Sequence, residues 1–365
     1  MNTLTSDHIL LTGFPGFLGS ELLLRSLKKS SDRFSCLVQG KFRPLAEQKL
    51  ESWTGKHPEV RDRVRLIEGD ITQAGLGITV SDGLSDVSRV QHFAAVYDLN
   101  VKKEIAQRIN VEGTQNILRF CEGLPRLSRL DYVSTCYVSG KYEGVFKEDD
   151  LDRAKVFNNH YESTKHEAEK SVRLAMKNGL PATIFRPAIV VGNSRTGETD
   201  KFDGPYFVMQ WLLRQGDRAL LPRLGDPDRF TINLVPSDFV VEAIAALCAD
   251  PSAAGKTFQL AHPAPLTIGE TVRVIAEACG KRLIEIPLPK WLAKSAVGGI
   301  PGLERWLGIP RSSLDYFVHP TSYDTTNATA HLQKLGIHCP RFDEYAFRLV
   351  EFMKKHPEIR KQAMI

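Results

Sequence analysis

A glycine-spaced segment near the start of the chain constrains the fold more than any other feature. The segment Thr12–Gly19, TGFPGFLG, follows a short apolar run at 9–11 and precedes a stretch with helical spacing at 18–27. A turn of this kind lets the backbone approach a pyrophosphate, and the N–H groups at the start of the helix hold the anion. The segment therefore predicts a strand–turn–helix unit that binds a dinucleotide. The residues expected to contact the dinucleotide are Gly13, Phe14, Pro15, Gly16, Phe17 and Leu18.

The rest of the first half alternates short apolar runs with longer amphipathic stretches. Strand-like runs lie at 35–38, 64–67, 89–93, 129–133 and 182–185, and long helical stretches at 101–121 and 160–178. Strands that alternate with helices of this length predict a parallel sheet covered on both faces. We therefore expect an α/β fold of the Rossmann type, with a doubly wound parallel sheet.

The character of the sequence changes near residue 192. Loops rich in Gly and Asp are predicted at 192–205 and 221–228, helices at 206–214, 238–248 and 268–279, and a strand at 257–260. We expect an NAD(P)-binding Rossmann domain at 1–191 and a smaller, mainly substrate-binding domain at 192–365. A segment at about 229–262 is expected to return to the first domain. The apolar stretch 288–309 is interrupted by charges, which predicts a pair of core or lid helices.

Composition and charge exclude several classes of partner and location. The net charge of +5 comes without a basic tail or a nucleic-acid motif, so no nucleic-acid partner is expected. No run of about 18 apolar residues exists, so no integral membrane segment is expected, and the first residues lack a signal peptide. The six cysteines have no CxxC spacing, which is typical of a reducing compartment. We expect a cytoplasmic protein.

The histidines show no pattern typical of metal ligands. No two histidines have HxxxH or HExxH spacing, and six of the ten are interpreted as surface or capping residues. These are His160, His166, His262, His319, His331 and His338. No metal site is predicted.

The segment after the second predicted strand bears on the choice between NAD and NADP. In a dinucleotide fold an acid at this point binds the ribose 2′-hydroxyl, whereas a cation accommodates a 2′-phosphate. The strand ends at Gln39, and the cations Lys41 and Arg43 follow without a carboxylate between them. We therefore expect a preference for NADPH, with NAD(H) as the alternative cofactor.

Tyr161 and Lys165 form the candidate catalytic pair. A spacing of four places a phenol and an ammonium on one face of a helix, one turn apart. Hydride addition to a carbonyl creates an alkoxide that must be protonated, and a phenol with a pKa of about 10 is a reluctant acid–base group. A neighbouring cation favours the phenolate and lowers that pKa. Tyr137 and Lys141 have the same spacing, but Gly140 interrupts them, so they need not share a face.

These motifs resemble the extended branch of the short-chain dehydrogenases/reductases. The resemblance runs from about residue 9 to 280 and implies that Lys165 also holds the nicotinamide ribose. It also implies that Thr135 binds the substrate carbonyl oxygen and helps to stabilise the oxyanion, with Ser134 as the alternative. Asp70 matches the acid that binds the adenine. The other matched cofactor-site residues are Ile71, Ala94, Ala95, Asn110, Pro187, Ala188 and Val190.

Several longer sequence segments resemble those of one group of enzymes within that branch. The segments 69–78, 157–169 and 233–241 look like those of thioester reductases and fatty acyl-CoA reductases of the male sterility type. The resemblance implies a role in lipid metabolism, namely NADPH-dependent reduction of an acyl thioester to an aldehyde or an alcohol. The acyl group would arrive as a CoA ester or on a separate acyl-carrier protein.

Other interpretations share the same residues. One is a ketone/alcohol oxidoreductase similar to 3β-hydroxysteroid dehydrogenase or dihydroflavonol reductase. A sugar-nucleotide epimerase or dehydratase normally carries an acid after the second strand, which this chain lacks. The intact set Thr135, Tyr161 and Lys165 argues against a non-catalytic NADP-binding regulator. The acyl chain, the direction of the reaction and the oligomeric state are left open.

Overall fold

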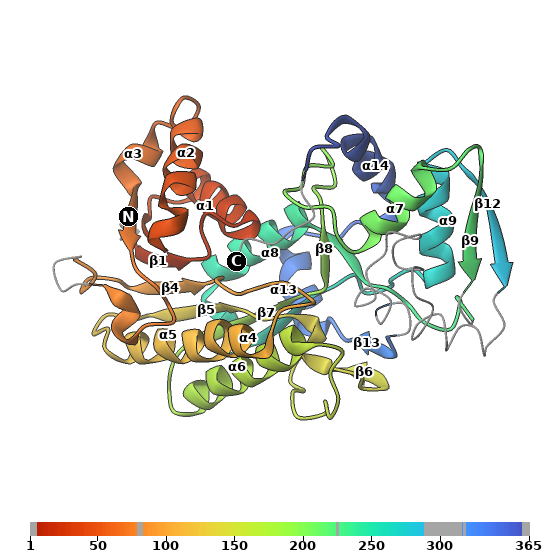
Figure 1. Ribbon diagram of the computed structural model, residues 1–365. Helices are drawn as coiled ribbons and strands as arrows, with labels where there is room; N and C mark the ends of the chain where they lie inside the picture. Colours follow the sequence, from red (N-terminus) through yellow and green to blue (C-terminus); the bar gives the residue numbers. More distant parts are fainter. Residues whose placement is uncertain (1–5, 79–82, 224–225, 288–315, 317–318, 360–365) are drawn as a thin grey trace.

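A seven-stranded parallel sheet forms the centre of the molecule (Figure 1). The computed structural model describes residues 6–78, 83–223, 226–287, 316 and 319–359. The strand order is β11-β7-β5-β4-β1-β2-β3, with every neighbouring pair parallel. The strands are β1 (His8–Thr12), β2 (Arg33–Val38), β3 (Val64–Glu68), β4 (Arg89–His92), β5 (Arg129–Val133), β7 (Ala182–Pro187) and β11 (Thr257–Leu260). The expected α/β fold with a parallel Rossmann-type sheet is confirmed.

Helices cover both faces of this sheet. On one face lie α1 (Phe17–Lys29), α2 (Arg43–Thr54), α3 (Glu59–Arg63) and α8 (Ser237–Ala249); on the other lie α4 (Lys103–Ala106), α5 (Gly113–Glu122) and α6 (His160–Lys177). Leu22 of α1 packs with α8 residues in one apolar cluster, while Ile117 of α5 and Val172 of α6 share another. Burial of these apolar faces holds the layers together.

The helix expected at 101–121 is interrupted in the structure. A π-helical stretch, Gln107–Glu112, separates α4 from α5. It carries the buried Asn110, whose side chain accepts a hydrogen bond from Val96 N–H (3.0 Å) and donates one to Thr164 (3.0 Å). Single turns of this kind are frequent at functional sites. The spacing of apolar residues does not predict this π-helical stretch, because the apolar side chains of α4 and α5 on either side of it still face the sheet.

The C-terminal part packs beside the sheet around a second apolar core. Its helices are α7 (Pro205–Leu213), α9 (Ile268–Ala278) and α14 (Ala346–Lys355), whereas α13 (Thr326–Leu332) packs with α8 and β11 of the main sheet. Paired short strands are β6 (Gly144–Phe146) with β13 (Thr321–Tyr323), β8 (Ile189–Val191) with β10 (Leu234–Pro236), and β9 (Arg218–Arg223) with β12 (Arg282–Pro287). Short 3-10 helices lie at Gly40–Phe42, Ala74–Gly77, Cys136–Ser139, Pro251–Ala253, Gln333–Leu335 and Phe342–Glu344. Residues of α7, α9 and α14 share the second core.

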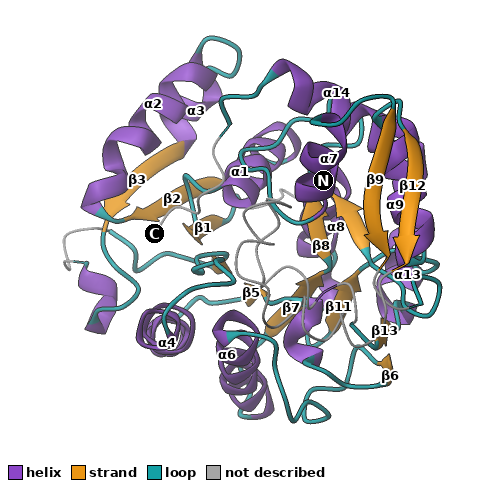
Figure 2. Ribbon diagram, turned by 45° about the vertical axis from the view of Figure 1, so that its right-hand side comes forward, coloured by secondary structure: helices purple, strands orange, loops and turns teal. Residues whose placement is uncertain are grey.

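One loop begins later than predicted. The expected loop at 221–228 begins inside β9, which pairs in parallel with β12 (Figure 2). β9 is stabilised by hydrogen bonds to β12, which lies some sixty residues later in the sequence. The Pro, Gly and Asp content of 221–228 reflects only the local preference for a loop. The helix pair expected at 288–309 lies outside the described residues. Within the described part of the chain, no helix is long and apolar enough to cross a membrane.

Candidate active site

The glycine turn after β1 is built so that only glycine fits at two positions. Gly13 has φ of +95°, and a Cβ there would lie 2.8 Å from the Phe93 carbonyl carbon and 2.9 Å from Ala94 N. A Cβ on Gly19 would lie 2.7 Å from the Gly13 oxygen. Gly16 precedes α1 without a side-chain cap, and the first turn of α1 carries no acid. The turn therefore presents a helix N-terminus suited to an anion, and the residues present fit a dinucleotide pyrophosphate.

The predicted adenine and 2′-phosphate residues lie at the carboxyl ends of β2 and β3. Asp70 accepts a hydrogen bond from Thr72 N–H (2.8 Å). Burial raises the pKa of Asp70, but hydrogen bonds from Thr72 and Gln39 outweigh burial and lower it overall. The Lys41 ammonium lies 4.9 Å from the Phe42 ring centroid. The glycine turn follows β1 at the same edge of the sheet.

The sequence prediction missed an acid in this region. Arg43 pairs with Glu47 (2.9 Å) and lies 3.9 Å from Glu68. Glu68 ends β3, and a Cβ on Gly40 would lie 2.9 Å from its Oε1. Glu68 belongs to β3, the strand next to β2. The sequence directly after β2 therefore gives no sign that a carboxylate lies near Arg43.

The remaining predicted cofactor residues follow the carboxyl ends of the sheet strands or cover them. Ala94 N–H donates to Thr12 Oγ1 (3.1 Å), which joins the ends of β1 and β4. Ile71 follows β3 and is buried against Gly113. Three further residues occupy the end of β7 and the following β8: Pro187, Ala188 and Val190. Parallel α/β sheets bind ligands at this edge.

Tyr161 and Thr135 are brought together. Asn159 caps α6 by accepting a hydrogen bond from Glu162 N–H (3.0 Å), so the helix begins next to Tyr161. The Tyr161 side chain lies close enough to Thr135, which follows β5, for the Thr135 side chain to lower the pKa of the phenol. Burial raises the pKa of Tyr161, although Thr135 opposes this. Tyr97 covers the phenol edge-on, with ring centroids 5.1 Å apart.

Lys165, the other predicted catalytic residue, has two hydrogen-bond partners on β5. Its ammonium donates to Tyr132 OH (2.9 Å) and to the Val133 carbonyl (2.7 Å). Burial lowers the pKa of Lys165 to about 7, against an opposing effect of Glu169. The side chain extends toward β5, and the pKa of Tyr161 is raised rather than lowered. Burial is the largest influence on the pKa of both groups, and activation of the phenol by this cation stays a prediction.

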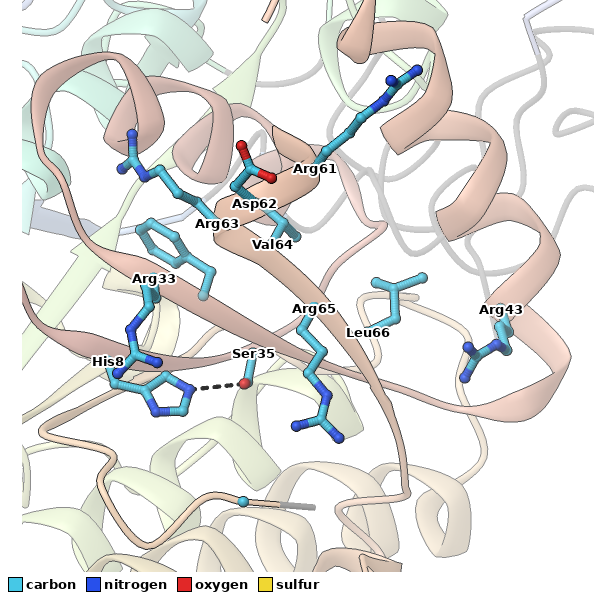
Figure 3. Close-up of a pocket in the computed structure, with 12 residues that line it drawn as sticks. His8, Arg33, Ser35, Arg43, Arg61, Asp62, Arg63, Val64, Arg65 and Leu66 are labelled. Atoms are coloured by element: carbon cyan, nitrogen blue, oxygen red, sulfur yellow. Dashed lines mark hydrogen bonds between the residues drawn. The ribbon is translucent and has the colours of Figure 1, made fainter. Parts of the chain in front are cut away.

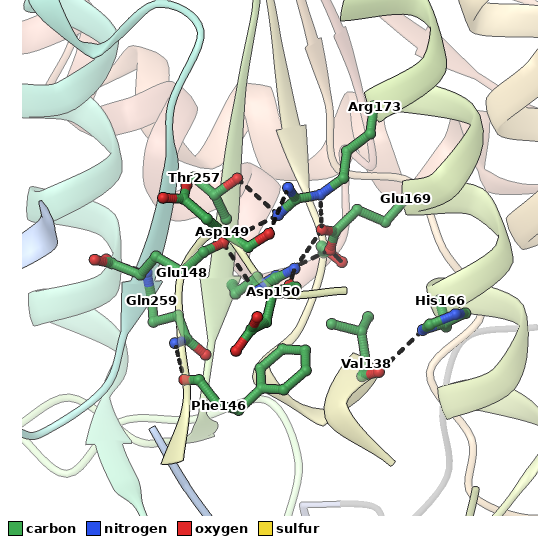
Figure 4. A network of polar contacts seen from close by, with 12 residues as sticks. Val138, Phe146, Glu148, Asp149, Asp150, His166, Glu169, Arg173, Thr257 and Gln259 are labelled. Carbon is green, nitrogen blue, oxygen red and sulfur yellow. Dashed lines mark hydrogen bonds and ion pairs between the residues drawn. The ribbon is translucent and has the colours of Figure 1, made fainter. Parts of the chain in front are cut away.

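Ser134, the alternative to Thr135, belongs to a buried ionic network instead. Ser134 Oγ donates to Glu169 (2.6 Å), which pairs with Arg186 (2.6 Å) and with Arg173 (2.9 Å; Figure 4). Glu169 and Arg186 are both fully buried. Burial raises the pKa of Glu169, but Arg186 outweighs burial, and the pKa falls to about 2. The network attaches α6 to β5 and β7, and thereby orients Tyr161.

The surroundings of Tyr137, His166 and His319 could not be predicted from the neighbouring sequence. Tyr137 falls in a 3-10 helix that ends at Gly140, with φ of +50°, so Tyr137 and Lys141 share no helical face. His166 and His319 are buried rather than exposed. Their burial depends on contacts with elements distant in sequence, namely the Val138 carbonyl for His166 and Tyr137 for His319.

A separate hollow lies away from this site (Figure 3). It measures about 600 Å³ and lies along β3, at the sheet's outer edge. Its charged lining includes Arg33, Arg43, Arg61, Arg63 and Arg65. His8 and Ser35, hydrogen-bonded at 2.9 Å, also line it. Thr135, Tyr161 and Lys165 do not line it, so this hollow is separate from the candidate site.

Comparisons with known proteins agree on a family. A family model described as "Male sterility protein" matches residues 11–244. A linear gramicidin synthase protein of Brevibacillus parabrevis is 26% identical over 375 residues, covering 96% of this chain and 7% of that protein. Fatty acyl-CoA reductase wat of Drosophila melanogaster is 30% identical over 280 residues, covering 65% of this chain and 53% of that protein. The chain thus spans about half the length of the second relative and a small part of the first.

A solved structure shows the same architecture along nearly the whole chain. The terminal R domain from the myxalamid PKS-NRPS biosynthetic pathway has a TM-score of 0.82 and 28% identity, covering 99% of this chain and 94% of that one. The expected resemblance is confirmed by this match together with the family model. The chain belongs to the male sterility protein family of NAD-binding domains, with the fold of the extended short-chain dehydrogenases/reductases.

Proposed function

We propose that the chain reduces an acyl thioester with NADPH, releasing a thiol and an aldehyde that can be reduced further to an alcohol. The observation that carries this proposal is the pair Thr135 and Tyr161, which lie after β5 and at the start of α6, close enough for the Thr135 side chain to lower the pKa of the phenol. Two relatives are named as a fatty acyl-CoA reductase and as the R domain of a synthase pathway. Both names are consistent with a thioester substrate.

The two hydroxyl groups serve as donors to the substrate oxygen. NADPH, when bound, supplies the hydride. Because burial raises the pKa of Tyr161, its hydroxyl stays protonated at neutral pH and is able to donate. Thr135 and Tyr161 then stabilise the oxyanion that forms when the thioester carbon becomes tetrahedral, and Tyr161 supplies a proton to it. Collapse of the hemithioacetal breaks the C–S bond and releases the thiol, leaving the aldehyde.

A coupled assay tests the reaction class. Purified protein is given NADPH and hexanoyl-CoA, and free thiol and aldehyde are measured together. We expect one thiol released for each aldehyde formed and one NADPH oxidised for that step. Reduction of a simple ketone panel without thiol release from any acyl-CoA or acyl-carrier substrate would instead support the ketone/alcohol oxidoreductase.

The activity should fall as the pH rises through about 7. The pKa of Lys165 is lowered to about 7, so its ammonium form dominates below that pH and is lost above it. We propose that this ammonium holds the cofactor ribose and favours the developing negative charge, so kcat/KM should decline on the alkaline side. A Lys165→Arg variant, which stays charged, should move the decline to higher pH. A profile that is flat between pH 6 and 9 would contradict this role.

The preference for NADPH should depend on Lys41 and Arg43. Replacing both with alanine should lower the NADPH-to-NADH ratio of kcat/KM by about tenfold or more, because a charge-assisted contact to the 2′-phosphate is removed. Glu68→Gln should raise the ratio, since it removes an acid that lies 3.9 Å from Arg43. Lys56→Ala, an exposed cation beyond the far end of α2, is the matched control. An unchanged ratio in the double variant would refute the assignment.

A further inference from the structure

Tyr97 is an aromatic residue with an exposed surface beside the proposed acid, Tyr161. It lies in the loop that follows β4, at the carboxyl edge of the sheet. Its ring stands edge to face against the ring of Tyr161, with centroids 5.1 Å apart and an angle of 80° between the planes. Tyr161 is 9% exposed, whereas Tyr97 is 41% exposed. The pair therefore presents the ring of Tyr97, more than the phenol itself, to a molecule that enters from solvent.

A cation from the C-terminal part of the chain holds the ring of Tyr97. The Lys201 ammonium lies 5.0 Å from the centroid of this ring, a distance typical of a cation–π contact. Asp203 forms an ion pair of 2.7 Å with the same ammonium. Phe202, between them in sequence, is 1% exposed and packs on Tyr206, with ring centroids 5.1 Å apart. A buried anchor and an ion pair therefore fix Lys201 against the ring.

The segment that carries Lys201 also contacts the coenzyme side of the site. Asp200 lies 3.7 Å from the Lys49 ammonium. Lys49 in turn donates a hydrogen bond to the Pro15 carbonyl of the glycine turn (3.3 Å). We call residues 200–203 the bridging segment, because these contacts connect the glycine turn with Tyr97. Tyr97 thus contacts the proposed acid and also a segment attached to the proposed coenzyme turn.

The first carbon of the acyl chain, next to the thioester carbon, lies within reach of Tyr97 in the proposed reaction. The thioester oxygen lies against the hydroxyl groups of Thr135 and Tyr161 in that reaction. The first acyl carbon is bonded to the carbon that carries this oxygen, so it stays beside the phenol. The ring of Tyr97 packs directly on the ring of Tyr161. Substituents on the first acyl carbon therefore come into van der Waals contact with Tyr97.

We infer that Tyr97 is a specificity residue, which contacts the first acyl carbon and selects unbranched acyl thioesters over those branched at that carbon. The inference rests on the proposed thioester reduction. An unbranched chain carries only hydrogens at this carbon and lies along a flat ring, whereas a methyl branch must displace the ring. Displacement costs the contacts of the ring with Tyr161 and Lys201. One methylene group in an apolar pocket changes kcat/KM by about 10- to 200-fold.

The test compares hexanoyl-CoA with each enantiomer of 2-methylhexanoyl-CoA, using NADPH and thiol release. In the wild-type protein kcat/KM for the unbranched ester should be about tenfold or more above that for either branched ester, and Tyr97→Ala should bring this ratio to within about threefold. Tyr97→Phe keeps the ring and should keep the ratio.

Two further variants sharpen the test. Lys201→Met removes the cation from the ring and should lower the ratio part of the way. Leu174→Ala, which removes an apolar side chain that is 60% exposed near the end of α6, is the matched control and should leave the ratio unchanged. Thermal melting shows whether each variant is folded, and Tyr97→Leu takes the place of an unfolded Tyr97→Ala.

The outcomes separate the inference from the proposed function. Equal kcat/KM values for the three esters in the wild-type protein, or an unchanged ratio in a folded Tyr97→Ala, would overturn the inference and leave thioester reduction standing. A loss of kcat by the same factor for every ester in that variant would show that Tyr97 only positions Tyr161, and would also overturn the inference. Absence of thiol release from every ester, with NADPH bound, would overturn the proposed function and the inference together.

Discussion

Replacing Tyr161 with phenylalanine should lower kcat by about 10²- to 10⁴-fold. The variant removes one hydroxyl from a buried ring and leaves the packing against Tyr97 intact. The proton donor to the substrate oxygen and one of two oxyanion donors are lost, while Thr135 remains. Steady-state NADPH oxidation measures the loss, and fluorescence titration should show that NADPH still binds.

A matched variant separates this effect from general loss of a tyrosine hydroxyl. Tyr142→Phe removes a phenol outside the proposed site, near β6, and should change kcat by less than about twofold. Turnover in Tyr161→Phe within twofold of the wild type would exclude Tyr161 as the acid. A loss that vanishes when NADPH is saturating would assign the residue to cofactor binding instead.

Replacing Arg186 with methionine should lower the free energy of unfolding by about 3–5 kcal/mol. Arg186 and Glu169 are both fully buried, with an ion-pair distance of 2.6 Å. Removing the guanidinium leaves a buried carboxylate with Arg173 as its remaining cation, and also frees the Asp150 carbonyl (2.6 Å). Such a loss is a large part of the stability of an ordinary domain.

Urea denaturation measures this change. Lys355→Met is the control, because it breaks an ion pair of similar length, 2.7 Å, with the exposed Glu351. Exposed pairs contribute little, so the control should lose no more than about 1 kcal/mol. Equal losses in the two variants would show that the buried network does not anchor α6.

The parts of the fold that were predictable are those in which local pattern and tertiary structure agree. Central strands of a parallel sheet are buried on both faces, so the apolar run at 9–11 in β1 stands out in the sequence. The turn at 12–19 was predictable for a related reason, since only glycine fits Gly13 and Gly19.

The parts that were not predictable depend on partners distant in sequence. The parallel pairing of β9 with β12 joins two segments that lack a strong strand pattern. Lys165 was expected to act on Tyr161, but its direction depends on Tyr132 and Val133, which belong to β5. His319 was interpreted as a surface residue because nothing near it in the sequence reveals that Tyr137 covers it.

The position of β11 affects how this protein can be divided or recombined. β11 closes one side of the sheet against β7, in a register that runs from Thr257–Ile184 to Leu260–Pro187. A fragment cut after residue 191 would expose the backbone groups of β7 along that side and invite association with other chains. A chimera that combines the nucleotide-binding half of this protein with the substrate-binding part of a relative must therefore keep β11 of this protein. Such a chimera needs two junctions, one on either side of β11, in addition to the one near residue 191.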